Sequence, residues 1–90
     1  MKHYKNNTLL AGIAKVAAKL RGAKSSKLSQ EDVMSDIKIN TGISIHIGRI
    51  ETAVNNITIS NLSLLCDYYG VSLSKFFSMV EIEMKKEESR

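Results

Sequence analysis

The chain of 90 residues has no proline and no tryptophan, and its five glycines are scattered. Because Ser and Asn are scattered as well, no stretch has the composition of a flexible linker, and no internal repeat is present. Ninety residues are the length of one domain. We therefore expect one domain over residues 1–90, with its core at about 9–80 and a charged tail at 81–90.

The chain has a single cysteine, Cys66, which excludes an intramolecular disulfide and fits the reducing environment of the cytoplasm. The neighbouring residues Leu62, Leu65 and Tyr69 are apolar or aromatic. We therefore expect a cytoplasmic protein in which Cys66 is a buried thiol and not a nucleophile.

Long apolar runs are also missing, and none approaches the ~20 residues that a transmembrane helix needs. The segment 9–18 loosely resembles a signal peptide. Lys15 and Lys19 interrupt that pattern at helical spacing, however, and no cleavage site follows. We interpret the segment as an amphipathic helix and expect no membrane partner.

The sequence has few signs of catalytic chemistry. It lacks a glycine-rich phosphate loop, a cysteine–histidine pairing and a carboxylate pair framed by helix signals. His46 has no second His, Cys or acid at ligand spacing, so a packing role or a phosphate contact is favoured over a metal site. We therefore predict that the protein is not an enzyme, has no metal or cofactor and shows no small-molecule effector site.

The charge is moderately basic, with a net charge of +4, and the acidic residues gather at the C-terminal end. Residues 1–80 carry ten Lys and Arg against five acidic residues. A small basic domain suits a polyanion such as nucleic acid, although many solvated surfaces have the same composition.

Apolar residues recur at three- and four-residue steps in five segments, which predicts an all-α fold. The first helix covers about 9–20 with Thr8 as its N-cap, and the second begins after Ser29, with Asp32 completing a capping box. The third covers about 44–54, although its β-branched residues alone would suggest a strand. Caps at Thr58 and Ser72 begin the last two helices, and Gly70 ends the fourth.

Several motifs follow one another at family-like spacing. They are Ser29-Gln30-Glu31-x-Val33, Thr41-Gly42-Ile43, Ile47-Gly48-Arg49-Ile50-Glu51, Asn56-Ile57-Thr58-Ile59, Leu62-x-x-Leu65-Cys66 and Gly70-Val71-Ser72-Leu73-Ser74-Lys75-Phe76-Phe77. Together they resemble the phage-repressor/Cro type of helix-turn-helix protein, also called the xenobiotic-response-element family. The resemblance covers about residues 9–80.

The resemblance implies a five-helix, lambda-repressor-like bundle whose second and third helices read double-stranded DNA, the third in the major groove. Gln30 would bind the DNA backbone, and Ser44, Ile45 and Arg49 would face the groove. Thr52, Asn55 and Asn56 would lie near the flanking phosphates, and we add His46 as a candidate phosphate contact. An arginine late in the first helix pairs with the glutamate that ends the third, which assigns a structural ion pair to Arg21 and Glu51.

The residues of the third segment support this orientation by themselves. If Ile43, Ile47, Ile50 and Val54 form one buried line, the outward residues are Ser44, Ile45, Gly48, Arg49 and Thr52. Arg49 is then the only cation on that face, and its fork geometry suits guanine. Gly48 permits either close approach to DNA or close helix packing. Ile45 either contacts a thymine methyl or is an exposed or dimer-facing apolar residue.

The chain departs from the family pattern at four places. Three extra residues fall around 37–41, and two more extend the loop at 22–27. Ala53 stands where the family usually has glycine, and Ile57 where it usually has proline. The longer turn between the second and third helices bears directly on which residue starts the third.

We therefore expect a small transcriptional regulator that binds specific double-stranded DNA as a homodimer on an inverted repeat. Met79 and Ile82 lie off the apolar stripe of the last helix and are the expected dimer interface. The alternative is a protein-interaction module on the same fold, such as an antitoxin or another partner-binding regulator. The Arg21–Glu51 pair is expected to be buried, against the alternative of an exposed surface pair worth less than ~1 kcal/mol.

Overall fold

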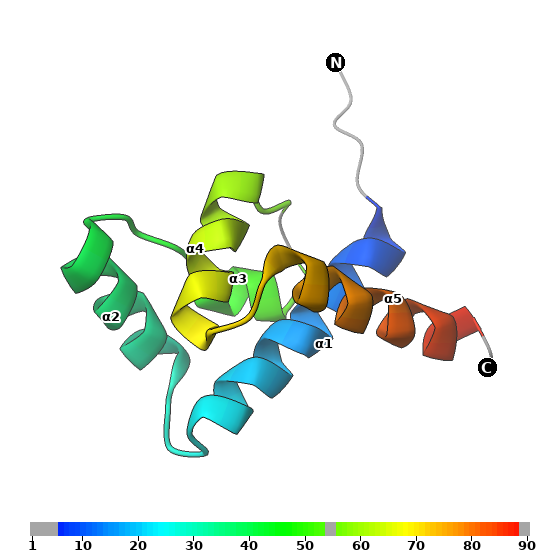
Figure 1. Ribbon diagram of the computed structural model, residues 1–90, viewed down its shortest axis with the longest axis horizontal. Coiled ribbons are helices and arrows are strands. Elements are labelled where there is room, and N and C mark those ends of the chain that lie inside the picture. The colour runs from blue at the N-terminus through cyan, green and yellow to red at the C-terminus, as the bar shows by residue number, and fades with distance from the viewer. Residues whose placement is uncertain (1–5, 54–55, 89–90) are drawn as a thin grey trace.

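The computed structural model describes residues 6–53 and 56–88, and this part of the chain is helical, with no strand (Figure 1). The prediction of an all-α fold is therefore confirmed. Within the described residues there are five helices: α1 (Asn7–Lys24), α2 (Gln30–Thr41), α3 (Ile47–Glu51), α4 (Ile59–Tyr69) and α5 (Leu73–Glu88).

The helix α1 is the centre of the bundle, because it packs against α3, α4 and α5. The helix α2 packs against α3 and α4 instead. In Figure 1, α2 lies at the left and α5 at the right, with α1 and α4 between them. The molecule therefore has two sides on either part of α1. One side is formed by α2 with α3, and the other is formed by α5.

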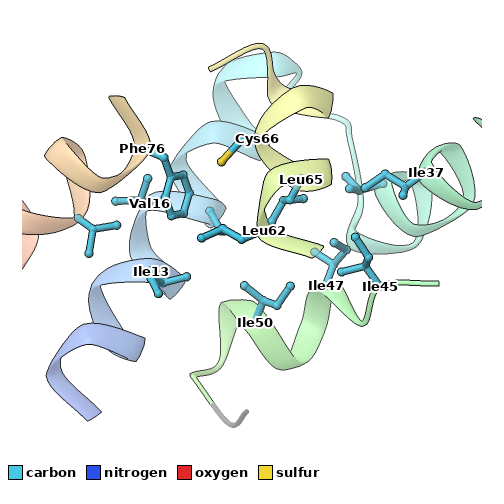
Figure 2. Close-up of a cluster of buried hydrophobic side chains, with 13 residues drawn as sticks. Ile13, Val16, Ile37, Ile45, Ile47, Ile50, Leu62, Leu65, Cys66 and Phe76 are labelled. Carbon is cyan, nitrogen blue, oxygen red and sulfur yellow. The ribbon is translucent and has the colours of Figure 1, made fainter. Parts of the chain in front are cut away.

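The core joins these two sides through one cluster of apolar side chains. Figure 2 shows Val16 of α1, Leu62 and Leu65 of α4 and Phe76 of α5 in its centre, and all four are buried. Cys66 belongs to the same cluster, and burial raises the pKa of its thiol. The expected burial of the Cys66 thiol is therefore confirmed.

Side-chain caps stabilise the N-termini of α1, α2, α4 and α5, and three of these four caps are at the expected residues. The Ser29 hydroxyl accepts a hydrogen bond from the Asp32 amide, and the Asp32 carboxylate accepts one from the Ser29 amide. The hydroxyls of Thr58 and Ser72 cap α4 and α5 by accepting hydrogen bonds from the Asn61 and Lys75 amides. The N-cap predicted for α1 is wrong: Asn6, not Thr8, accepts from the Leu9 amide, and Thr8 lies inside the first turn.

Three helices end at a residue in the left-handed region. Gly42 and Gly70 end α2 and α4 with φ of 75° and 73°, which glycine adopts at little cost. After α3 the same conformation falls on Ala53, with φ of 59°. The alanine that replaces the usual family glycine therefore occupies a backbone conformation that costs an L-residue about 1 kcal/mol.

The third helix is shorter than predicted, since it begins at Ile47 and not at Ser44. Residues 43–46 are non-helical, and of their side chains only that of Ile45 is buried. Consequently Ile43 is 41% exposed and Ile45 only 3%, the reverse of the predicted orientation. The expected burial of Ile47 and Ile50 is confirmed, and Val54 lies outside the described residues.

The helix α5 continues to Glu88, so the described residues of the predicted charged tail, 81–88, belong to this helix. The helix crosses α1 closely at Gly12, where a Cβ atom would lie 3.0 Å from Val80 Cγ1. Farther along, the Glu83 carboxylate is buried and accepts a hydrogen bond from Lys19 of α1. None of the helices in the described part of the chain has the length and apolar character of a membrane span.

Candidate functional site

The structure gathers five of the predicted site residues around one surface hollow of about 130 Å³. It lies between the segment 43–46, α3, the segment after α3 and the start of α4. We call it the α3 hollow; its lining residues are Ser44, Ile45, His46, Arg49, Ile50, Asn56, Ile57, Thr58 and Asn61. Hydroxyl, imidazole, guanidinium and amide groups therefore surround one concave surface.

Arg49 reaches this surface because of the orientation of α3. Ile47 and Ile50 hold one side of the short helix in the core, and Figure 2 shows both side chains directed into the cluster. Arg49 comes two residues after Ile47, on the exposed side of the helix, and lines the hollow. Its position agrees with the predicted outward face.

Ser44 is held by α2, although it precedes α3. Its hydroxyl accepts a hydrogen bond from Lys38 Nζ at 3.0 Å. The Thr41 hydroxyl donates to the Ile37 carbonyl and accepts from the Ile43 amide, which ties the next residue to the end of α2. Lys38 was not among the predicted residues, because only the folded turn brings it to Ser44.

The DNA contact predicted for Ile45 is wrong. The side chain is buried beside Ile47 in the core, and it reaches the α3 hollow only as part of the wall (Figure 2). The physical reason is the non-helical backbone at 43–46, which places Ile45 and Ile47 on the same side of the chain. His46 lies between them and is exposed, and it precedes α3 without a side-chain cap.

The predicted phosphate contacts after α3 are only partly described. Thr52 is exposed, but its hydroxyl donates to the Gly48 carbonyl at 2.8 Å and so closes the end of the helix. Asn56 is exposed and lines the α3 hollow. Asn55 lies outside the described residues.

Gln30 is half-buried and already bonded within the protein. Its Nε2 donates to Glu51 Oε1 at 3.0 Å. Its Oε1 lies against Gly48, 3.0 Å from the position that a Cβ atom would take there. Close helix packing, one of the two expected roles of Gly48, agrees with this geometry, because the missing side chain makes room for Gln30.

The predicted pair of Arg21 and Glu51 is confirmed, with two parallel hydrogen bonds. Arg21 Nε donates to Glu51 Oε2 at 2.8 Å and Nη2 donates to Oε1 at 2.9 Å, while Nη1 donates to the Leu28 carbonyl. The glutamate side chain is 4% exposed and the arginine 25%, so the carboxylate is buried and the guanidinium is partly covered. The hydrogen bond to Glu51 raises the pKa of Arg21 against the opposing effect of burial.

Two tyrosines of α4, Tyr68 and Tyr69, have surroundings that the sequence did not predict. The Tyr68 hydroxyl donates to Asp36 of α2 at 2.5 Å, and its ring lies under Lys24 of α1. Burial and the neighbouring carboxylate raise the pKa of Tyr68 to about 12. The buried Tyr69 hydroxyl has no hydrogen-bond partner among the described residues, and burial raises its pKa.

The residues predicted for a dimer interface lie on the far side of the molecule, on α5. Met79 is half-buried and Ile82 is 56% exposed. Lys75 and Lys86 continue the same helical row, one turn before and one turn after them. The row is therefore apolar in the middle and basic at both ends.

Within the described residues no group of His, Cys, Asp and Glu side chains is arranged to hold a metal ion. Comparisons with the models of known protein families, with curated proteins and with solved structures find no match for this chain. The geometry of the chain itself is therefore the basis for a functional assignment.

Proposed function

We propose that this protein is a small cytoplasmic transcriptional regulator that binds specific double-stranded DNA sequences, with α2 and α3 acting as a helix-turn-helix. The observation that carries the proposal is the orientation of α3. Ile47 and Ile50 on its apolar side are buried in the core, and Arg49 lies on the opposite, exposed side.

The chemistry around Arg49 suits a DNA major groove. A guanidinium forms two parallel hydrogen bonds with guanine O6 and N7, and Ser and Asn side chains reach other base edges or phosphates. Ser44, His46 and Asn56 surround the same hollow as Arg49. The net positive charge of the chain supports binding to a polyanion, and the resemblance to the phage-repressor family points to the same function.

The short α3 changes which part of the chain would enter the groove. A helix of five residues offers little more than Arg49 on its exposed side, and the exposed Thr52 follows as its C-cap. The exposed residues Ile43, Ser44 and His46 precede it in a segment that is tied to α2. We assign base reading to this segment together with Arg49, and phosphate contacts to Asn56.

Selection of bound duplexes from a random library at near-physiological salt tests the proposal. We expect a defined consensus, and Arg49→Ala should weaken specific binding by about 1–3 kcal/mol and relax one base position. Binding should also weaken steeply with salt, because each neutralised phosphate releases counterions. A library without any enriched sequence after selection would refute the proposal.

We further propose that the regulator is a homodimer through α5, which would present two reading units to an inverted repeat. In an antiparallel pairing that places Met79 opposite Ile82 of the second copy, Lys75 faces the second copy's Lys86. These exposed like charges repel weakly and are screened by salt. Sedimentation should therefore show a dimer that tightens as salt rises, whereas DNA binding weakens; a monomer at tens of micromolar at every salt concentration would remove this dimer.

The second candidate function is a protein-interaction module on the same fold, such as an antitoxin. Large apolar side chains at Ile39, Ile59 and Ile82 are 80%, 66% and 56% exposed and are therefore accessible to a protein partner. The same duplex selection separates the two candidates. An absence of enriched sequences together with unaltered folding would leave the interaction module as the better assignment.

A further inference from the structure

We infer that Gly48 is a positioning residue: because it has no side chain, it lets the Gln30 amide bond Glu51 at the start of α2, and so prepares this amide to contact DNA. The contact between Gly48 and Gln30 is a property of the folded chain alone. Its consequence for DNA depends on the proposed function.

A continuous chain of hydrogen bonds fixes Gln30 from one side. Arg21 of α1 holds both carboxylate oxygens of Glu51, at 2.8 and 2.9 Å, and also donates to the Leu28 carbonyl just before α2. Glu51 Oε1 in turn accepts from Gln30 Nε2 at 3.0 Å. The amide of Gln30 is therefore tied through α3 to the central helix.

Gly48 leaves room for the same amide on its other side, because it has no side chain. A Cβ atom on residue 48 would lie 3.0 Å from Gln30 Oε1 and 3.9 Å from its Cδ, and no other neighbour comes within 4 Å. The distance of 3.0 Å is closer than ordinary van der Waals contact, so an alanine there would push the amide away by a few tenths of an ångström. Because Nε2 is held by Glu51, that shift would strain or break the Gln30–Glu51 hydrogen bond.

This arrangement leaves one donor of Gln30 for a ligand. A primary amide carries two N–H groups, and one of them is used on Glu51. Gln30 is the first residue of α2, where backbone amides and the helix dipole also favour an anion. A DNA phosphate at this position would receive the second N–H, already oriented by Glu51 and Gly48.

The first experiment concerns the contact itself and needs no DNA. Gly48→Ala is compared with Gly22→Ala, a matched control in α1 whose added methyl meets nothing within 4 Å. We expect the side-chain amide resonances of Gln30 in ¹⁵N NMR spectra to move in Gly48→Ala and to stay unchanged in Gly22→Ala. Unchanged Gln30 resonances in a folded Gly48→Ala variant would overturn the inference.

The second experiment concerns DNA and uses the duplex found by selection. Gly48→Ala should lower affinity about tenfold, the effect of one hydrogen bond to a charged acceptor, and Gln30→Ala should lower it by a similar factor. In the Gln30→Ala background, Gly48→Ala should have no further effect. Gly22→Ala should bind as the wild type does.

The outcomes separate this inference from the proposed function. If the two losses are additive, Gly48 acts at the DNA independently of Gln30 and the positioning role is refuted. If the wild type selects no sequence, the proposed function fails, and the NMR comparison still decides whether Gly48 holds Gln30. If Gly48→Ala binds with wild-type affinity although the Gln30 resonances move, the prepared amide has no part in DNA binding.

Discussion

Two ion pairs of α1 hold the two sides of the molecule, and they are built differently. Arg21 connects α1 to Glu51 of α3 with two hydrogen bonds and reaches a backbone carbonyl with a third. Lys19 connects α1 to Glu83 of α5 with a single ammonium, and its side chain is 58% exposed. Both carboxylates are nearly buried, at 4% and 9% exposure.

The difference between the two ion pairs follows from the helix that each pair connects to α1. Lys19 and Arg21 are two residues apart, so the helix turns them to nearly opposite directions. The α5 side is packed by apolar contacts around Gly12, and the lysine only neutralises one carboxylate. The α3 side has a helix of only five residues, of which Ile47 and Ile50 are buried in the core. A planar guanidinium with several donors fixes both the position and the angle of that helix.

The largest effect is expected from breaking the pair on the α3 side. Arg21→Ala leaves Glu51 as a buried carboxylate without its main partner, and should lower the free energy of unfolding by about 3 kcal/mol. Lys19→Ala should cost less, because water reaches the lysine end of that pair. Urea unfolding of both variants measures the difference.

A double variant serves as the control for that comparison. Arg21→Met combined with Glu51→Leu removes both charges and should recover much of the lost stability. Equal losses for Lys19→Ala and Arg21→Ala would show that the two pairs are equivalent, contrary to our interpretation of the geometry.

The α5 side should instead be sensitive to added volume. In Gly12→Ala the new methyl would contact Val80 Cγ1 at 3.0 Å and Met84 Cγ at 3.2 Å, so α5 has to move away. We expect a loss of about 1–3 kcal/mol, as for overpacked cores. Thermal unfolding measures this loss, with Gly22→Ala as the control that should gain about 0.5 kcal/mol from helix propensity. A Gly12→Ala variant as stable as Gly22→Ala would contradict close packing of α1 on α5.

The α3 side also contains backbone strain that the α5 side lacks. Ala53 adopts a left-handed conformation directly after α3, at a φ of 59°. Ala53→Gly should therefore raise the free energy of unfolding by about 0.5–1 kcal/mol, in spite of the greater flexibility of glycine in the unfolded chain. Chemical denaturation checks the sign, and a loss of stability would show that Ala53 is not strained.

The smallest expected effect is on the stability of the protein at low pH. The hydrogen bond from Lys19, helped by the charges of Lys19 and Lys86 and opposed by burial, lowers the pKa of Glu83 below its usual value. A lowered folded-state pKa contributes stability above the unfolded-state pKa of roughly 4.3, and this contribution is lost as the pH falls through the folded-state value. Melting temperatures of Glu83→Gln should fall less steeply below about pH 4.3 than those of the wild type. Parallel pH curves for the two proteins would exclude a role for this pair.

Much of the fold was predictable because its signals are local. The capping box of Ser29 and Asp32, the caps at Thr58 and Ser72 and the left-handed Gly70 depend on residues a few positions apart. The pairing of Arg21 with Glu51 came from the family resemblance, since nothing in a local pattern joins residues 30 positions apart.

The errors concentrate where helical periodicity was extended too far. A four-residue spacing placed Ile43 inside and Ile45 outside, but the turn after Gly42 is non-helical and reverses them. The same error made α3 too long and put Ile45 among the DNA contacts. The acidic composition of the C-terminal residues likewise suggested a tail, whereas Glu83 in that stretch is buried against α1.

The sequence by itself determined that the described chain is helical, where α2, α4 and α5 begin, where α2 and α4 end, and that Cys66 is buried, because caps, glycine stops and apolar spacing act within a few residues. Only the tertiary structure decided which isoleucine before α3 faces the core, that Lys38 reaches Ser44, and that Gly48 makes room for Gln30. Those outcomes depend on where segments distant in the chain meet, and no periodicity within a single segment contains that information.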